Sequence, residues 1–358
     1  MKLKKSNYVC VVPFTAIEVH DNRSFLCCAS WLKKYLPYGK GIKESWNSQE
    51  AKDIRDSMLD GSYKFCDSVQ CPFLNKLENG IVEPNVLVRK SKINPNQHSA
   101  LSKAIEKHKD GIEYSPTTVQ FSFDRTCNLK CPSCRIDLFV ADSKKIKSVK
   151  ATIDEIENEY SDSIETLYIT GSGDPFISVG FRDFLRNFDK RKYPKLKRIH
   201  LHTNATKWNK EMWDSMKNIH PYVVSCEISI DAGTKDTYEN KTRINGDWDE
   251  LIENLKFIST IPDLIHIKPS FVVQNHNYKE MKIFYDLMLD IFGKKATVFF
   301  GKINNWGTFG TEEFAEHKVW DESHENYSEF VNEVNNLLPA NQSFNNLEEF
   351  ITYKKTII

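Results

Sequence analysis

The sequence predicts an α/β protein whose main part is a partial (β/α)₆ TIM-like barrel. Strand-like and helix-like segments alternate between residues 116 and 306, which is typical of a parallel sheet with right-handed helical crossovers. Six such units are present, whereas the closed barrel of this type has eight, so we expect an open barrel. The expected strands are 119–124, 165–170, 198–204, 223–231, 264–274 and 297–302.

The chain has 358 residues, which suits a barrel with an appended module. The helices between the strands are expected at 148–160, 181–189, 210–218, 248–259 and 278–292. We expect four regions in the chain: a cysteine-rich amino-terminal module (1–90), a linker (91–115), the barrel (116–306) and a carboxy-terminal helical extension (307–358).

The composition argues against several classes of partner. The chain carries 49 basic and 49 acidic residues, so no overall field favours nucleic acid or an anionic membrane. No apolar run is long enough to cross a membrane, and the apolar stretch near the amino terminus is short and interrupted by Pro13. We therefore expect a cytoplasmic protein, whose nine cysteines are reduced or bind metal rather than form disulfides.

Polar and apolar residues alternate in four of the expected strands. Strands that are buried on both faces normally have continuous apolar sequences. The alternation therefore predicts that one face of these strands contacts water or polar groups. Because apolar faces pack against the outer helices, the polar faces are predicted to line a wet, ligand-holding interior. The polar positions are Gln120, Ser122, Asp124, His200, His202, Asn204, Ser225, Glu227, Ser229, Asp231, His266, Lys268, Ser270 and Gln274.

Three cysteines with the spacing C-x₃-C-x₂-C follow the first expected strand. They are Cys127, Cys131 and Cys134. A tetrahedral zinc site needs a fourth protein ligand, and no other cysteine lies nearby in the sequence. Three thiolates can instead hold three irons of a 4Fe–4S cubane and leave the fourth iron open to another ligand. A structural zinc or buried free thiols are the alternatives.

These residues resemble the cluster motif of the radical S-adenosylmethionine (radical SAM) superfamily. The resemblance implies a 4Fe–4S cluster on Cys127, Cys131 and Cys134, with S-adenosylmethionine (SAM) on the open iron. It also implies an electron donor such as flavodoxin or ferredoxin, whose electron cleaves SAM to a 5′-deoxyadenosyl radical. The family usually has an aromatic residue before the last cysteine, where this chain has Ser133.

Later strand ends resemble the SAM contacts of the same family. Gly171, Gly173 and Asp174 follow the second strand, where the family has a glycine-rich turn and an acidic residue for the methionyl amino group. Ser229 and Asp231 end the fourth strand and resemble the ribose-binding motif. Arg243 resembles an arginine that pairs with the SAM carboxylate.

The amino-terminal cysteines resemble an auxiliary-cluster module of the SPASM or shorter twitch type. In the family this module usually follows the barrel, whereas here it comes first. Its four implied ligands are Cys10, Cys27, Cys66 and Cys71, with Cys28 as the substitute for Cys27, and they suffice for one auxiliary 4Fe–4S cluster. A structural zinc site is the alternative, because thiolates at these spacings also suit zinc.

The resemblance implies a radical SAM enzyme that abstracts hydrogen from a C–H bond of a peptide, protein or carbohydrate-type substrate. Glu227 and His202 face the same predicted interior but belong to no SAM motif, so we expect them to contact the substrate. The alternative is a non-catalytic iron–sulfur or zinc-binding scaffold of the same fold. Asp174, Asp231 and Arg243 argue against it, because a scaffold needs no SAM contacts.

Overall fold

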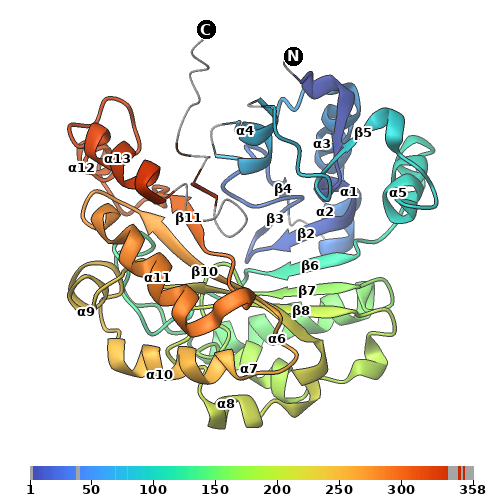
Figure 1. Cartoon of the computed structure of the whole chain (residues 1–358). Coiled ribbons are helices and arrows are strands. Elements are labelled where there is room, and N and C mark those ends of the chain that lie inside the picture. The colour runs from blue at the N-terminus through green and yellow to red at the C-terminus, as the bar shows by residue number, and fades with distance from the viewer. Residues whose placement is uncertain are drawn as a thin grey trace, which may run out of the picture. The chain divides into compact units, whose positions relative to one another are not determined.

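The computed structural model describes residues 3–37, 41–68, 70–78, 80–337, 346–347 and 350, and is drawn in Figure 1. The chain forms two compact units. The first comprises Met1–Asp124, Ser148–Tyr168 and Asp189–Lys197, and the second comprises Arg125–Lys147, Ile169–Phe188 and Arg198–Ile358. The first expected barrel strand therefore groups with the amino-terminal residues, and the division does not fall near residue 90.

The strands of the first unit form a mixed arrangement. β2 pairs in parallel with β6, while β3 joins β2, and β4 joins β3, in antiparallel fashion. A separate antiparallel pair consists of β1 and β5. The bounds are β1 (Tyr8–Cys10), β2 (Ala16–Val19), β3 (Arg23–Phe25), β4 (Leu36–Pro37), β5 (Leu87–Arg89) and β6 (Thr118–Phe121), followed by β7 (Thr166–Ile169), which begins in this unit.

Helices of the first unit follow the apolar period of the sequence. α3 begins at the capping residue Ser48, whose hydroxyl accepts a hydrogen bond from the Ala51 amide at 3.3 Å, and buries Ile54 and Met58. The segment expected to be a linker contains α5, because Leu101 and Ile105 share a buried face. The helices are α1 (Val12–Thr15), α2 (Ile42–Asn47), α3 (Gln49–Asp60), α4 (Pro72–Glu78), α5 (Ser99–Lys109) and α6 (Ser143–Tyr160), of which α6 begins in the second unit.

The second unit contains four consecutive parallel strands in the order β8, β9, β10, β11, which confirms the expected parallel α/β architecture. Figure 1 shows α10 and α11 next to these strands, and α11 contacts both α10 and β10. The elements are α7 (Val179–Arg186), β8 (Arg198–Thr203), α8 (Lys210–Asp214), β9 (Val223–Ser229), α9 (Lys235–Thr237), the π-helical turn η5 (Tyr238–Thr242), α10 (Trp248–Ser259), β10 (His266–Val273), α11 (Met281–Phe292), β11 (Phe299–Lys302), α12 (Thr311–His317) and α13 (Tyr327–Leu337).

Alternation along β8, β9 and β10 is largely as the sequence predicts. Cys226 and Ile228 are buried, while Ser225 and Glu227 lie on the other face. The expected apolar partner at the start of β9 was Val224, but the register shifts there, because Ile199 pairs with Val223 and the next residue pairs with Ser225. Val224 is thus a bulge residue, and Val223 takes the buried position.

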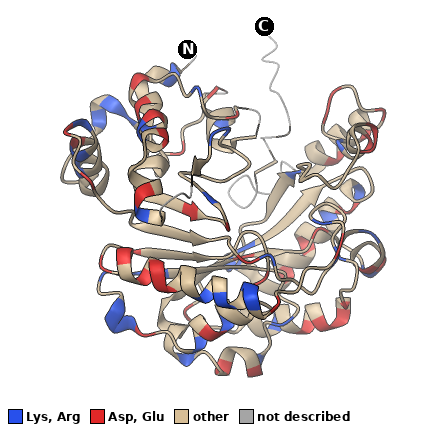
Figure 2. Ribbon diagram, turned by 180° about the vertical axis from the view of Figure 1, so that it is seen from behind, with Lys and Arg blue, Asp and Glu red and all other residues tan. Residues whose placement is uncertain are grey.

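Basic and acidic side chains are interspersed along the ribbon, in keeping with the balanced composition (Figure 2). In the part of the chain that the structure describes, none of the helices combines the length and the apolar character that crossing a membrane requires.

Candidate functional site

The three cysteines of the C-x₃-C-x₂-C motif lie together in one loop of the second unit. Cys127 and Cys131 are buried around Leu129, and Cys134 packs against this cluster. The loop is closed by its own backbone, because the amides of Cys134 and Arg135 donate to the Cys131 carbonyl at 2.9 and 3.0 Å. The sequence spacing therefore brings all three thiols to one place.

Each thiol accepts a hydrogen bond from a different part of the second unit. Asn204, just after β8, donates from Nδ2 to the Cys127 sulfur at 3.5 Å. Arg243, just after η5, donates from Nη1 to the Cys131 sulfur at 3.3 Å. Arg135 donates from Nη2 to the Cys134 sulfur at 3.5 Å. Such donors stabilise negative charge on sulfur, as a cluster-binding thiolate requires.

Arg135 is the cation that all three thiols share. Burial by itself lowers the pKa of its guanidinium, but the nearby sulfurs of Cys134, Cys127 and Cys131 outweigh burial and raise that pKa. Two backbone carbonyls fix the side chain: Nη1 donates to Arg125 at 2.8 Å and Nη2 to Ser172 at 3.1 Å. A fixed positive charge therefore lies beside the three sulfurs.

Two of these thiols, Cys127 and Cys131, are poor acids in this environment. Burial raises the pKa of Cys127 to about 11, and it also raises the pKa of Cys131 despite the opposing charge of Arg243. Binding to iron replaces the thiol proton, and the metal's positive charge offsets the cost of burying a thiolate. Three soft sulfur ligands with cationic and amide donors around them fit an iron–sulfur cluster.

Asp174 joins the glycine-rich turn to the end of β8. Its Oδ2 accepts hydrogen bonds from the Thr203 hydroxyl at 2.7 Å and the Asn204 amide at 2.9 Å, and its Oδ1 accepts one from the Phe176 amide at 2.9 Å. Its own amide donates to the Thr126 carbonyl at 2.9 Å, next to Cys127. Burial raises the pKa of this carboxyl, and the three donors oppose that rise. Asp174 thereby holds Asn204, the donor to Cys127.

The turn that contains Gly171 and Gly173 lies against the cysteine loop, since the Ser172 carbonyl between them binds Arg135. The Thr170 hydroxyl accepts hydrogen bonds from the amides of Ser172 and Gly173 at 3.2 and 3.4 Å and shapes the turn. The residues expected to form the SAM-binding turn are thus next to the cysteines. Their role toward SAM remains a prediction.

Asp231 and Arg243, expected to bind different parts of SAM, form an ion pair with each other. Arg243 Nη2 lies 2.6 Å from Asp231 Oδ2, and both side chains are buried. The other carboxylate oxygen of Asp231 accepts the Val272 amide at 2.7 Å. Asp231 has a φ of 62°, a left-handed conformation that non-glycine residues adopt mostly at turns or functional sites. Asp231 therefore orients the guanidinium that donates to Cys131.

The polar face of β8, β9 and β10 forms a hydrogen-bonded row. His202 Nε2 lies 3.0 Å from the Ser229 hydroxyl, and His200 Nδ1 lies 2.9 Å from that of Ser225. Lys268 Nζ lies 2.5 Å from Glu227 Oε2, and these two residues are register partners. The predicted substrate-side residues Glu227 and His202 are therefore register partners on one face, where each bonds another polar residue. The His202–Ser229 contact links them to the predicted ribose site.

Glu227 and His200 in this row differ in their protonation. Burial raises the pKa of Glu227, but Lys268, His202 and His200 outweigh burial and lower that pKa to about 2. Burial lowers the pKa of His200 to about 3. At neutral pH, Glu227 is therefore an anion and His200 is neutral.

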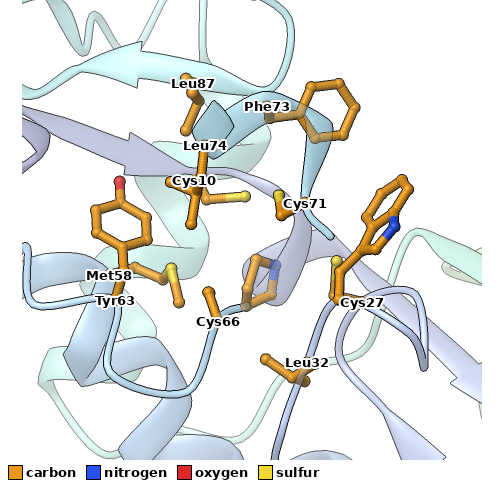
Figure 3. Close-up of a pocket in the computed structure, with 12 residues that line it drawn as sticks. Cys10, Cys27, Leu32, Met58, Tyr63, Cys66, Cys71, Phe73, Leu74 and Leu87 are labelled. Atoms are coloured by element: carbon orange, nitrogen blue, oxygen red, sulfur yellow. The ribbon is translucent and has the colours of Figure 1, made fainter. Parts of the chain in front are cut away.

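In the first unit, Cys10, Cys27, Cys66 and Cys71 line one pocket with apolar neighbours (Figure 3). Figure 3 shows the side chains of Cys10 and Cys71 pointing toward each other from β1 and from the residue just before α4. Cys28 is different, because its sulfur lies 3.1 Å from the Ser30 hydroxyl. The apolar lining residues include Trp31, Leu32, Met58, Phe73, Leu74 and Leu87.

Three of these thiols, Cys10, Cys27 and Cys66, are also poor acids. Burial raises the pKa of Cys66 to about 12 and raises the pKa values of Cys10 and Cys27 as well, and the neighbouring cysteines raise them further. Metal-free thiols would therefore be neutral here, whereas four thiolates around a metal centre would gain compensating charge. Among the described residues, no three or more His, Cys, Asp or Glu side chains are arranged to hold a single metal ion.

Two residues that bond the cysteine sulfurs, Arg135 and Asn204, were not predicted from the sequence to do so. Arg135 was given no role, although it follows Cys134 directly and carries the charge that a thiolate cluster needs. Asn204 was placed on the polar face of its strand but was not linked to the cysteines. Alternation can place a residue on a face, but it does not show which loop bonds to that residue.

Residues 121–286 match the family model described as the Radical SAM superfamily. The matched segment contains Cys127, Cys131, Cys134, Asp174 and Arg243. No curated protein matches the chain.

Several solved structures are similar to this chain at low identity. SuiB of Streptococcus suis, bound to the precursor peptide SuiA, is 15% identical with a TM-score of 0.44, over 78% of this chain and 65% of SuiB. The protein anSMEcpe with bound AdoMet and Cp18Cys peptide is 13% identical with a TM-score of 0.43, over 64% of this chain and 63% of that chain. The chain thus spans less than two thirds of these two relatives, and no residue role transfers at such identities.

The shared contact with three sulfurs predicts that Arg135→Gln will change the redox behaviour of the site. Removing a positive charge beside the thiolates disfavours the added electron, so the midpoint potential of the bound cluster should become more negative. An anaerobic redox titration followed by electron paramagnetic resonance measures this. Arg186→Gln is the matched control, because Arg186 is an exposed arginine of the same unit that bonds Ser215 and Met212. Equal potentials in wild type and Arg135→Gln would contradict this role.

Proposed function

We propose that this protein is a radical SAM enzyme. A 4Fe–4S cluster on Cys127, Cys131 and Cys134 would supply the electron that cleaves SAM to a 5′-deoxyadenosyl radical, which abstracts hydrogen from a substrate C–H bond. The observation that carries the proposal is the loop with three thiols, each of which accepts a hydrogen bond from a different side chain.

Several residues would orient SAM at the cluster. The backbone of Gly171 and Gly173 can approach the methionyl amino group closely, next to Asp174. Ser229 and Asp231 would lie at the ribose, and Arg243 would meet the carboxylate while it donates to Cys131. The Asp231–Arg243 ion pair supports this assignment, because it fixes the guanidinium in one orientation.

The substrate would meet the polar face of β8, β9 and β10. Glu227 and His202 are the proposed substrate contacts. Glu227 forms an ion pair with Lys268, so this face carries charged groups that a polar substrate can bind. A polar peptide, protein or carbohydrate could replace or join these hydrogen bonds. We also propose a reducing compartment such as the cytoplasm, because the free thiols of both cysteine groups would be oxidised elsewhere.

We further propose that Cys10, Cys27, Cys66 and Cys71 hold one auxiliary 4Fe–4S cluster in a SPASM- or twitch-like module. The four thiols share one apolar pocket, and iron would offset the raised pKa values found there. Cys27 is preferred to Cys28 because Cys27 lines the pocket, whereas the Cys28 sulfur is next to Ser30. A structural zinc site is the second candidate, since four thiolates suit zinc as well.

Anaerobic protein supplied with dithionite and SAM should release 5′-deoxyadenosine. Replacing Cys127, Cys131 and Cys134 by alanine should abolish this product, because the open iron would be lost. Chromatography of the quenched reaction measures the product. Cys226→Ala is the matched control, since Cys226 is buried in the same unit but belongs to neither cysteine group. Persistent 5′-deoxyadenosine in the triple variant would sink the assignment.

The same triple variant tests the auxiliary cluster. It should still retain about four irons per chain, as one cubane requires. Adding Cys27→Ala should lower this iron content, whereas adding Cys28→Ala should not. Metal analysis by mass spectrometry measures both. Zinc with negligible iron in the triple variant would favour the structural zinc site.

Glu227→Gln tests the proposed substrate face. With a substrate that the wild type converts, the variant should lose coupled turnover while iron content and SAM affinity stay unchanged, because no SAM motif contains Glu227. Glu253→Gln is the matched control, because it removes an exposed carboxylate from α10. A loss of SAM affinity at normal iron content would instead place Glu227 in the cofactor site.

A further inference from the structure

An exposed apolar segment follows the cysteine loop directly. Residues 136–140, called here the apolar loop, contain four large hydrophobic side chains that remain open to solvent. Ile136 is 66% exposed, Leu138 46%, Phe139 38% and Val140 73%. Single exposed hydrophobic residues are ordinary, but four within five positions indicate a surface that another molecule covers.

The apolar loop is anchored to the cysteine loop at both ends. It begins directly after Cys134 and Arg135, and near its end the Phe139 carbonyl accepts a hydrogen bond from the Cys127 amide at 3.1 Å. The next anchor is the Ala141 amide, which donates to the Thr126 hydroxyl at 3.1 Å. A molecule that covers these side chains would therefore lie close to Cys127, because the backbone of the apolar loop is bonded to that cysteine.

The chain on either side of the apolar loop is mostly basic. Between residues 130 and 147 the chain has Lys130, Lys144, Lys145 and Lys147 in addition to the buried Arg135, against two acidic residues, Asp137 and Asp142. Lys130 lies 3.4 Å from Asp137, and the basic residues outnumber the acidic ones in this segment, which gives it a net positive charge. An exposed apolar loop flanked by lysines complements a partner with apolar and acidic surface.

We propose that the apolar loop is the docking surface for an acidic redox protein that delivers single electrons to the cluster. This inference rests on the proposed function. One electron leaves the reduced donor, which is oxidised by one equivalent, and the cluster is reduced by one equivalent, with no proton transfer required. The position of the loop favours a donor over a substrate, because the loop is bonded to Cys127, whereas the candidate substrate residues lie on the strands.

The test compares two reductants on one variant. In Leu138→Glu/Val140→Glu, 5′-deoxyadenosine formation driven by reduced flavodoxin should fall at least about tenfold, as for loss of interface hot spots. Formation driven by dithionite should stay within about twofold, because a small reductant needs no docking surface. Ile265→Glu/Ile283→Glu is the matched control, since both isoleucines are exposed in the same unit, and it should keep both activities.

Equal losses with both reductants would overturn the inference, because the loop would then serve the cluster itself. Unchanged rates of 5′-deoxyadenosine formation with both reductants would overturn it too. If the variant lost substrate conversion but was still reduced normally by flavodoxin, the loop would be a substrate surface and the inference would be wrong. Titration calorimetry of oxidised flavodoxin measures docking without catalysis, and the affinity should fall in the variant and with added salt. The rate at which wild-type protein forms 5′-deoxyadenosine with dithionite tests the proposed function separately, because that reaction needs no docking surface.

Discussion

The hydrogen bonds to the three cysteine sulfurs are the interactions on which the rest of the site depends. Their donors, Asn204, Arg243 and Arg135, come from the end of β8, the residue after η5 and the cysteine loop itself. Two buried carboxylates orient the first two donors. Asp174 accepts a hydrogen bond from the backbone amide of Asn204, and Asp231 forms an ion pair with Arg243. Residues that look like separate cofactor contacts in the sequence thus form one network around sulfur. Burying these charges is favourable only as a set, because each would be costly without its partner.

Much of the second unit could be predicted from the sequence. The helix 248–259 and the strands at 198–204 and 264–274 were found because their apolar residues repeat with clear periods. The first unit was harder. β2 has only four residues, including the buried Glu18, whose carboxylate accepts hydrogen bonds from Ser122 and Gln120. A short strand with a charged residue carries no clear period, so the parallel pairing of β2 with β6 could not be seen.

The candidate site was predicted in its residues but not in its contacts. The spacing of Cys127, Cys131 and Cys134 identified the centre, and alternation placed His202 and Glu227 on one face. The pairing of Asp231 with Arg243 could not be read in advance, because it depends on the π-helical turn η5, which returns the chain to the end of β9. Likewise, the choice of Cys27 over Cys28 depends on which of two adjacent side chains faces the pocket.

In the proposed site, three thiols bind the cluster and leave one iron open for SAM. Electron–nuclear double resonance of the reduced protein, with SAM labelled with ¹⁵N at the methionyl amino group, tests it most directly. We expect a ¹⁵N hyperfine coupling to the cluster, which disappears in the triple alanine variant of Cys127, Cys131 and Cys134 and persists in Cys226→Ala. A reduced wild-type cluster that binds SAM without any such coupling would contradict it.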